Sequence, residues 1–478
     1  MASPPQVDVD LGKLSYEIFS FLESKFLYGG GGPGGGVCSL PGTPGRGPVG
    51  GGGARVRVLA IDGCGPGPGD ALLAAAALAR LEAALRAKAG DPDARVADFF
   101  DAAAGAGAGG VLAAMLFVRG DDGRPKYTAA DALAFVAASL GKGGWGGGGG
   151  GWRGRWAALF RRGERSSDKS SLSASSPSSS LRRVFGDATL RDTVAPLLVP
   201  CYDLATGAPF LFSRADAVES DSFDFRLRDV CAATCAGGSA AAAVRSVDGR
   251  TAIAAASGGV AAMGNPAAAA ITHVLHNKQE FPLAAGVDDL LVVSIGSGSS
   301  SGGTASGSAT PSAGWRTPIP PRSPSPAEMV RLTAEGVADM VDQAVAMAFG
   351  HTCGRNYVRI QAAAPAHSIK ALRSLEAKKV VAIADGMLTQ RNVEAELFRG
   401  RRLSEKSNRE KLDAFATELV KEHDRRRDSP PGLLPNVAIK QVSPTPPRLS
   451  SATTSSAATT GRTASTMPSP ASTQDSRH

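Results

Sequence analysis

The sequence predicts a three-layer α/β domain with a mainly parallel central sheet. Two apolar strands, at 54–62 and 96–105, are each followed by a glycine-rich turn and a helix, and a further buried strand is expected at 289–298. A strand, a glycine turn and a helix repeated in this order are typical of parallel sheets with crossover helices. The charged fraction of 20% and the hydrophobic fraction of 43% agree with a globular protein that has an ample core.

The first element of the chain lies outside this domain. Residues 13–28 carry apolar side chains at helical spacing, which predicts an amphipathic helix that packs on the main domain or anchors the chain to a membrane or a partner. The helix and the glycine-rich linker at 29–54 form an N-terminal region over 1–54. No basic stretch followed by an apolar run opens the sequence, so we expect no secretory signal.

The α/β domain is expected over 55–361. Low-complexity insertions are predicted at 120–180 and 299–326. Outside them the pattern predicts helices at 70–90, 108–117, 227–236 and 327–349, and strands at 209–214 and 356–362.

Beyond 361 the chain is expected to be helical and then disordered. Two helical segments, at 368–398 and 405–424, are predicted to form a C-terminal extension over 362–428. The Ser/Thr/Pro-rich tail at 429–478 has the composition of a disordered segment.

Bulk properties narrow the class of protein. The net charge of +8 favours contact with anionic surfaces, without deciding the fold. The six cysteines lack the paired spacing of a zinc site, so we expect reduced thiols, no metal and no cofactor. No run of 18 apolar residues occurs, which predicts a cytoplasmic protein or one that is peripheral at a membrane.

The glycine turn after the first strand is the first candidate for chemistry. In it Gly63, Gly65, Gly67 and Gly69 alternate with other residues just before a helix. Backbone N–H groups in such a turn can bind a phosphate or the oxyanion of an ester under attack. The spacing does not match the G-x-G-x-x-G of a dinucleotide site, and no Gly-Lys-Ser/Thr follows as a P-loop requires, so the oxyanion role is favoured.

Five segments in order resemble one family. VLAIDGCGPGPG at 58–69 resembles the first strand and oxyanion loop of the patatin-like lipid acyl hydrolases, and 93–117 resembles their nucleophile-elbow segment. The segments at 227–241, 257–270 and 290–299 resemble later parts of the same domain. The resemblance implies a phospholipase-type hydrolase of lipid degradation, acting on fatty acyl esters of phospholipids or galactolipids. The N-terminal helix and 392–403 further resemble a plant-type subgroup with a Gly-x-Gly-x-Gly elbow.

The sequence departs from the family at the catalytic positions. The resemblance places the nucleophile at Gly107 and the general base at Ser257, where the family has Ser and Asp. The oxyanion loop at Gly63, Cys64 and Gly65 lacks the family's arginine. A Ser–Asp dyad needs both a hydroxyl to attack and a carboxylate to take its proton. The sequence therefore predicts either weak or unconventional hydrolysis or a non-catalytic lipid-binding or regulatory protein that keeps the cleft.

Other residues offer poor substitutes for the dyad. Ser300 is central in a Gly-x-Ser-x-Gly match but is followed by a linker rather than by a helix. Asp248 precedes a glycine, and we interpret the pair as a hairpin turn between two strands rather than Asp248 as a displaced base. Cys64 is interpreted as a small loop residue because no histidine stands near it in sequence, and His351 and Cys353 as helix-end residues rather than metal ligands.

A basic segment at 152–165 is a candidate for membrane contact. It interleaves arginines with tryptophans, a composition suited to an anionic membrane surface. The candidate contact residues are Trp152, Arg153, Arg155, Trp156, Arg161 and Arg162. A solvated basic loop explains the same composition, and no nucleic-acid-binding fold accompanies it. The expected partners are therefore membrane lipids or a lipid-derived substrate, and no nucleic acid.

Overall fold

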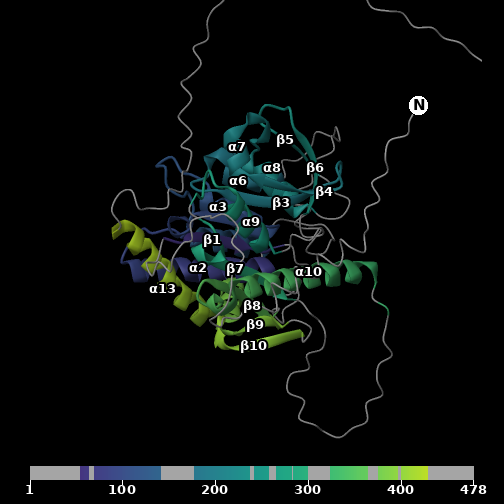
Figure 1. Ribbon diagram of the computed structural model, residues 1–478. Coiled ribbons are helices and arrows are strands. Elements are labelled where there is room, and N and C mark those ends of the chain that lie inside the picture. The colour runs from purple at the N-terminus through teal and green to yellow at the C-terminus, as the bar shows by residue number, and fades with distance from the viewer. Residues whose placement is uncertain are drawn as a thin grey trace, which may run out of the picture. The chain divides into compact units, whose positions relative to one another are not determined.

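A computed structural model describes the protein over ten stretches of chain (Figure 1). The described residues are 54–63, 69–140, 177–236, 242–257, 265–282, 284–299, 323, 325–363, 375–396 and 400–428. The predicted helix at 13–28, Cys64, Gly65, the basic segment at 152–165, Ser300 and the C-terminal tail all lie outside these residues.

The core of the fold is a sheet of eight strands, in the order β5-β6-β3-β2-β1-β7-β8 with β4 paired to β3. The parallel part contains β1 (Val56–Ile61), β2 (Ala102–Gly105), β3 (Leu197–Asp203), β7 (Leu290–Ser299) and β8 (Tyr357–Ala363). Strand β1 lies between β2 and β7 and is buried along its whole length. The predicted mainly parallel sheet is confirmed.

The remaining strands are antiparallel to the strands they pair with. They are β4 (Ala208–Ser213) and β6 (Ala252–Ser257), both paired with β3, and β5 (Ala242–Arg245), paired with β6. Strands β5 and β6 form a hairpin whose turn contains Asp248 and Gly249, the latter with φ at 75°. The predicted turn at Asp248 is therefore confirmed.

Helices cover both faces of the sheet, which gives three layers. Side chains alternate between faces along each strand, and Leu59 and Ile61 of β1 pack in one cluster whereas Val56 and Val58 pack in the other. The first cluster includes side chains of α2 (Gly69–Ala89), α3 (Ala108–Phe117), α4 (Ala129–Leu140), α6 (Pro177–Phe185), α8 (Leu227–Cys235), α12 (Ala377–Thr389) and α13 (Asn408–Asp428). The second includes those of α9 (Ala267–His276) and α10 (Pro326–Phe349).

Two predicted segments of the α/β domain differ in the structure. The strand expected over 96–105 is only Ala102–Gly105, because Val96–Phe99 forms a 3-10 turn whose apolar side chains enter the core. The insertion predicted at 120–180 contains the ordered helix α4, which packs on α2.

The C-terminal region is not purely helical. Where helices were expected over 368–398 and 405–424, the chain forms α12, then a hairpin of β9 (Arg391–Glu396) and β10 (Gly400–Ser407), then α13. The hairpin is selected by tertiary contact: the buried Asn392 side chain accepts a hydrogen bond from the Gln361 N–H of β8 at 2.7 Å.

Helix α13 is an integral part of the domain rather than an appendage. Its Glu422 accepts a hydrogen bond from the backbone N–H of Arg55, just before β1, at 2.8 Å. Its Arg426 contacts Asp101, just before β2, at 2.8 Å, and Asp101 also pairs with Arg57 at 2.9 Å. Burial alone would raise the pKa of Asp101, but the two guanidinium groups outweigh it and hold this pKa well below its usual value.

Candidate functional site

The sharp corner between β2 and α3 is formed by glycine. Strand β2 ends at Gly105 and α3 begins at Ala108, so Ala106 and Gly107 turn the chain into the helix, with Gly107 as the N-cap residue. Gly107 has φ 56° and ψ −125°, a conformation that non-glycine residues adopt only with strain. A strained turn from strand to helix is the geometry that α/β hydrolases use to present a nucleophile. Here the position has no side chain.

The turn after β1 packs backbone to backbone against this corner. A Cβ atom on Gly63 would lie 2.1 Å from the Gly109 nitrogen, and one on Gly109 would lie 2.2 Å from the carbonyl oxygen of Ile61. A Cβ on Gly105 would meet the Gly109 carbonyl at 2.4 Å. Contacts this short exclude any side chain, so the glycines are required for the two turns to meet.

The N–H groups at the corner already have acceptors. The Ala108 N–H donates to the Gly63 carbonyl at 3.0 Å. In an α/β-hydrolase elbow this N–H, of the residue after the nucleophile, serves the oxyanion. The Gly107 N–H donates to the Thr234 hydroxyl at 2.9 Å, and this hydroxyl donates in turn to the Pro200 carbonyl at 2.8 Å. Any oxyanion donor for a bound ester must therefore be another group.

Strand register brings the end of β6 to the same level as the corner. Ala104 of β2 pairs with Leu198 of β3, and Gly107 and Cys201 each follow three residues later. Cys201 pairs with Ser257, the last residue of β6. Because β4 occupies the other edge of β3, the backbone of Ser257 lies on the same edge of β3 as β2 and the elbow, at the carboxyl ends of the parallel strands. Of the predicted site, Gly63, Gly107 and Ser257 gather at this edge, whereas Cys64 and Gly65 are outside the described residues.

A buried ion pair holds the end of β1. The Arg359 guanidinium of β8 contacts the Asp62 carboxylate at 2.6 Å and donates to the Ser294 hydroxyl at 2.7 Å. Burial raises the pKa of Asp62 to about 6, and the charge and hydrogen bonds of Arg359 oppose a further rise. A Cβ on Gly296 would lie 2.9 Å from Arg359, so this glycine makes room for the guanidinium. Because Asp62 is fully engaged, we assign it the role of fixing the turn at Gly63 rather than that of a base.

The other candidate groups are not placed for catalysis. Cys201 is near the edge, but burial raises the pKa of its thiol to about 12, so it stays protonated. The Asp248 carboxylate accepts a hydrogen bond from Ser246 at 2.6 Å within the hairpin turn. His351 lies in the 3-10 turn after α10, beside the exposed Cys353. Within the stretches that the structure covers, no cluster of His, Cys, Asp or Glu could hold a metal ion.

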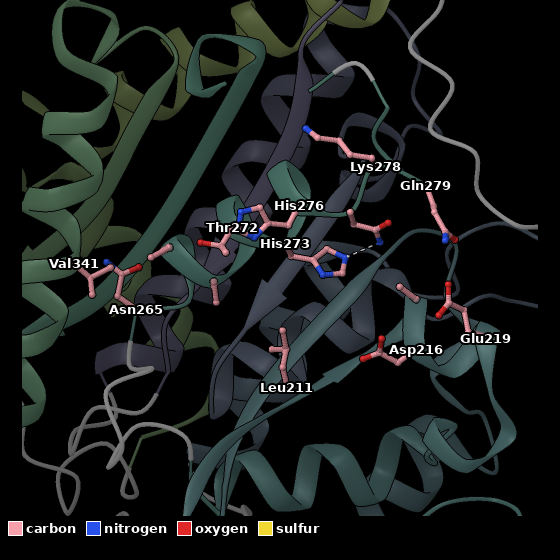
Figure 2. A pocket seen from close by; sticks show the side chains of 14 residues that line it. Leu211, Asp216, Glu219, Asn265, Thr272, His273, His276, Lys278, Gln279 and Val341 are labelled. Atoms are coloured by element: carbon pink, nitrogen blue, oxygen red, sulfur yellow. Dashed lines mark hydrogen bonds between the residues drawn. The ribbon is translucent and has the colours of Figure 1, made fainter. Parts of the chain in front are cut away.

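A groove of about 810 Å³ lies over α9, on the face of the sheet opposite to the face that α3 covers (Figure 2). Its described lining includes none of Gly63, Gly107 and Ser257. Carboxylates of α7 (Arg214–Glu219) line one side and imidazoles of α9 the other, as Asp216, Glu219, His273 and His276. The groove is therefore separate from the corner at Gly107.

Two residues of the site were not predicted from the sequence. Arg359 had a signal, because a single charge inside the apolar strand at 356–362 indicates a buried partner. No sequence signal marked Thr234, because a threonine in a predicted helix is ordinary. Its contact with Gly107 joins positions 127 residues apart.

Comparison with known proteins identifies the family. The family model described as patatin-like phospholipase matches residues 59–271. Patatin-like protein 3 of Oryza sativa subsp. indica is 54% identical over 429 residues, which cover 88% of this chain and 93% of that protein. The chain belongs to the patatin-like protein family.

Two Arabidopsis thaliana relatives of this patatin-like chain are also similar to it over most of their length. Patatin-like protein 7 is 43% identical, with 91% of this chain and 85% of that protein covered. Probable inactive patatin-like protein 9 is 39% identical, with 87% of this chain and 94% of that protein covered. None of the helices described for this patatin-like chain is long and apolar enough to cross a membrane.

Proposed function

We propose that this patatin-like protein binds fatty acyl lipids, such as phospholipids or galactolipids, at the carboxyl edge of its sheet without hydrolysing them through a Ser–Asp dyad. The observation that carries the proposal is Gly107, which occupies the corner between β2 and α3 with φ 56° and has no group that could attack an ester. At the position that the resemblance gives to the base, the sequence has Ser257, which cannot take up a proton at neutral pH.

The loss in reaction rate expected without a nucleophile supports binding over catalysis. Removing the nucleophile of a hydrolase typically costs about a millionfold in kcat, and roughly a thousandfold over water remains from the oxyanion site and substrate binding. The Ala108 N–H is already bonded to Gly63, so even this remainder would be reduced. The nearby Thr234 hydroxyl is a poor substitute nucleophile, because it is fully buried and its proton is bonded to Pro200.

Weak hydrolysis is the second candidate function. It is favoured by the match to a family model described as patatin-like phospholipase, whereas the relative named probable inactive favours the first. We further propose that the chain belongs to the plant-type subgroup in which Gly-x-Gly-x-Gly replaces Gly-x-Ser-x-Gly, as GAGAG at 105–109 suggests.

A combined binding and turnover assay tests the proposal. The purified protein is incubated with phosphatidylcholine carrying a fluorescent acyl chain, and both retained lipid and released fatty acid are measured. We expect stoichiometric retention and no release above the buffer blank. Release at an ordinary enzymatic rate, of about 1 s⁻¹ or more, would establish a hydrolase, and failure to retain lipid would refute the binding function.

A further inference from the structure

The groove over α9 has the size and the lining of a small-molecule site. Its volume of about 810 Å³ lies within the range of roughly 300–1,000 Å³ in which proteins hold drug-sized ligands. Apolar side chains from three elements line it, namely Leu211 of β4, Ala268 and Ala269 of α9, and Val341 of α10. The groove therefore offers an apolar surface, to which α7 adds carboxylates (Figure 2).

The Asp216 carboxylate is a polar group of this groove that has no donor of its own. Asp216 is exposed on α7, yet the surrounding wall partly desolvates its carboxylate, which raises the pKa of that group. Within the described part of the chain, no N–H or O–H group donates a hydrogen bond to it. The hydrogen-bonding capacity of this carboxylate is therefore open to a ligand.

The charges around Asp216 are mainly negative. After burial, the largest influence on the pKa of its carboxyl group comes from His273, which lowers it, followed by Glu219 and Glu280, which raise it. His273 carries a positive charge only when it is protonated. The buried Arg214 guanidinium lies 3.9 Å from the Glu280 carboxylate and offsets that charge rather than the charge of Asp216. The α7 side of the groove thus attracts a cation.

The lysine that lines the groove does not supply this cation. Lys278 follows α9, and its ammonium group donates a hydrogen bond to the Ala284 carbonyl. Figure 2 shows the Lys278 side chain pointing away from Asp216. The cation that Asp216 attracts is therefore expected to come from a ligand.

The lining selects among organic cations. Quaternary ammonium groups are bound over the faces of aromatic rings, and none of the described lining residues is aromatic. A primary ammonium group instead offers three N–H donors, which suit a carboxylate acceptor. Glu219, one turn after Asp216 on α7, brings a second carboxylate to the same side of the groove (Figure 2). The polar part of the ligand is therefore expected to be a primary amine.

We propose that the groove over α9 binds a small primary amine with an apolar body. Its ammonium group pairs with Asp216, and its apolar part lies against Leu211, Ala269 and Val341. The net charge of the whole chain is +8, so general attraction cannot gather cations and the binding is local to the groove. The groove is separate from the corner at Gly107, and the inference does not depend on the proposed lipid-binding function.

Titration calorimetry with hexylamine on the full-length chain tests the site. At about pH 8 imidazoles are neutral, whereas an alkylamine is still protonated, as lysine is. We expect hexylamine to bind at one site and hexanol, which has the same apolar part, to bind roughly fivefold more weakly, the upper range for an ion pair open to solvent. Butylamine should bind up to about fifteenfold more weakly than hexylamine, because it buries two methylene groups fewer.

Variants locate the binding in the groove. D216N should reduce the affinity for hexylamine to that for hexanol, and A269L should weaken both ligands because it fills part of the groove. The matched control is E405Q, because Glu405 is an exposed carboxylate on β10 and does not line the groove. E405Q should bind hexylamine like wild type, and all variants should keep the wild-type circular dichroism spectrum.

Several results would overturn the proposal. Equal affinities for hexylamine and hexanol would show an apolar hollow without a cation site, and tighter binding of hexanoate would assign the groove to anions. Hexylamine binding that survives both D216N and A269L would place the amine elsewhere on the chain. A free amine and the aminoethyl headgroup of a lipid share the proposed chemistry. Displacement of hexylamine by short-chain phosphatidylethanolamine supports the headgroup, and a failure to displace it supports a free amine.

Discussion

The contact between the turn after β1 and the elbow can be tested at Gly109. A Cβ added there would lie 2.2 Å from the Ile61 carbonyl oxygen and 2.5 Å from that of Asp62, whereas ordinary contact begins at 3.4 Å. The G109A variant must therefore move the two backbones apart by about 1.2 Å, the difference between 3.4 and 2.2 Å. Overpacking of this kind costs about 1–3 kcal/mol, and we expect the upper end because both neighbours are backbone.

A second helical glycine provides the control. Gly386 in α12 is exposed, and a Cβ there would meet nothing within 4 Å. The G386A variant gains only the helix propensity of alanine, about 0.5–1 kcal/mol, a gain that G109A also receives. We expect G109A to be destabilised by about 2 kcal/mol net and G386A to be slightly stabilised.

Urea unfolding followed by circular dichroism measures both variants. With an m value of about 3 kcal/mol/M, the midpoint of G109A should fall by roughly 0.7 M. Equal midpoints for G109A and G386A would show that the turn at Gly63 does not pack on the elbow, and the geometry of the site would then be wrong.

The remaining predictions concern buried polar contacts. The D101N variant should lose about 3–5 kcal/mol of stability, because the buried Arg57 is left with a neutral partner and Arg426 keeps only Glu422. The pKa of Asp101 is lowered in the folded protein, so its contribution is present above its unfolded pKa near 4 and is lost as the pH falls below that value. The urea midpoint of wild type should therefore drop between pH 5 and pH 3 more steeply than that of D101N, and parallel curves would contradict the assignment. The T234V variant should lose about 2 kcal/mol because the buried N–H of Gly107 is left without its acceptor, whereas T234S should retain most of the stability.

The sequence predicted the structure correctly where a local pattern of residues is compatible with only a few backbone conformations. The strand–glycine–helix repeats predicted the parallel sheet, and Asp248-Gly249 predicted the hairpin turn, because only a few backbone conformations suit such residues. The helix predicted across 390–398 failed because the hairpin of β9 and β10 depends on Asn392 bonding to β8, a contact 31 residues away. Long-range contacts of this kind leave no local pattern.

The candidate site was predictable only in part, again because long-range contacts leave no local pattern in the sequence. The resemblance singles out Gly63, Gly107 and Ser257, and the structure gathers their backbones at one edge of the sheet. The bonding of the elbow N–H groups to Thr234 and Gly63 could not be read from the sequence, because it depends on how β1, β2 and α8 pack.

The proposed function depends on an elbow that keeps its shape without a nucleophile. The most direct measurement is labelling by a fluorophosphonate probe, read by mass spectrometry, on wild type and on the G107S/S257D variant. We predict no adduct on wild type and an adduct on the introduced serine of the variant, because the corner already has the backbone of a nucleophile turn. An adduct on wild type would reveal another nucleophile, and an inert but folded variant would show that this corner does not present a reactive side chain; either result would contradict the account.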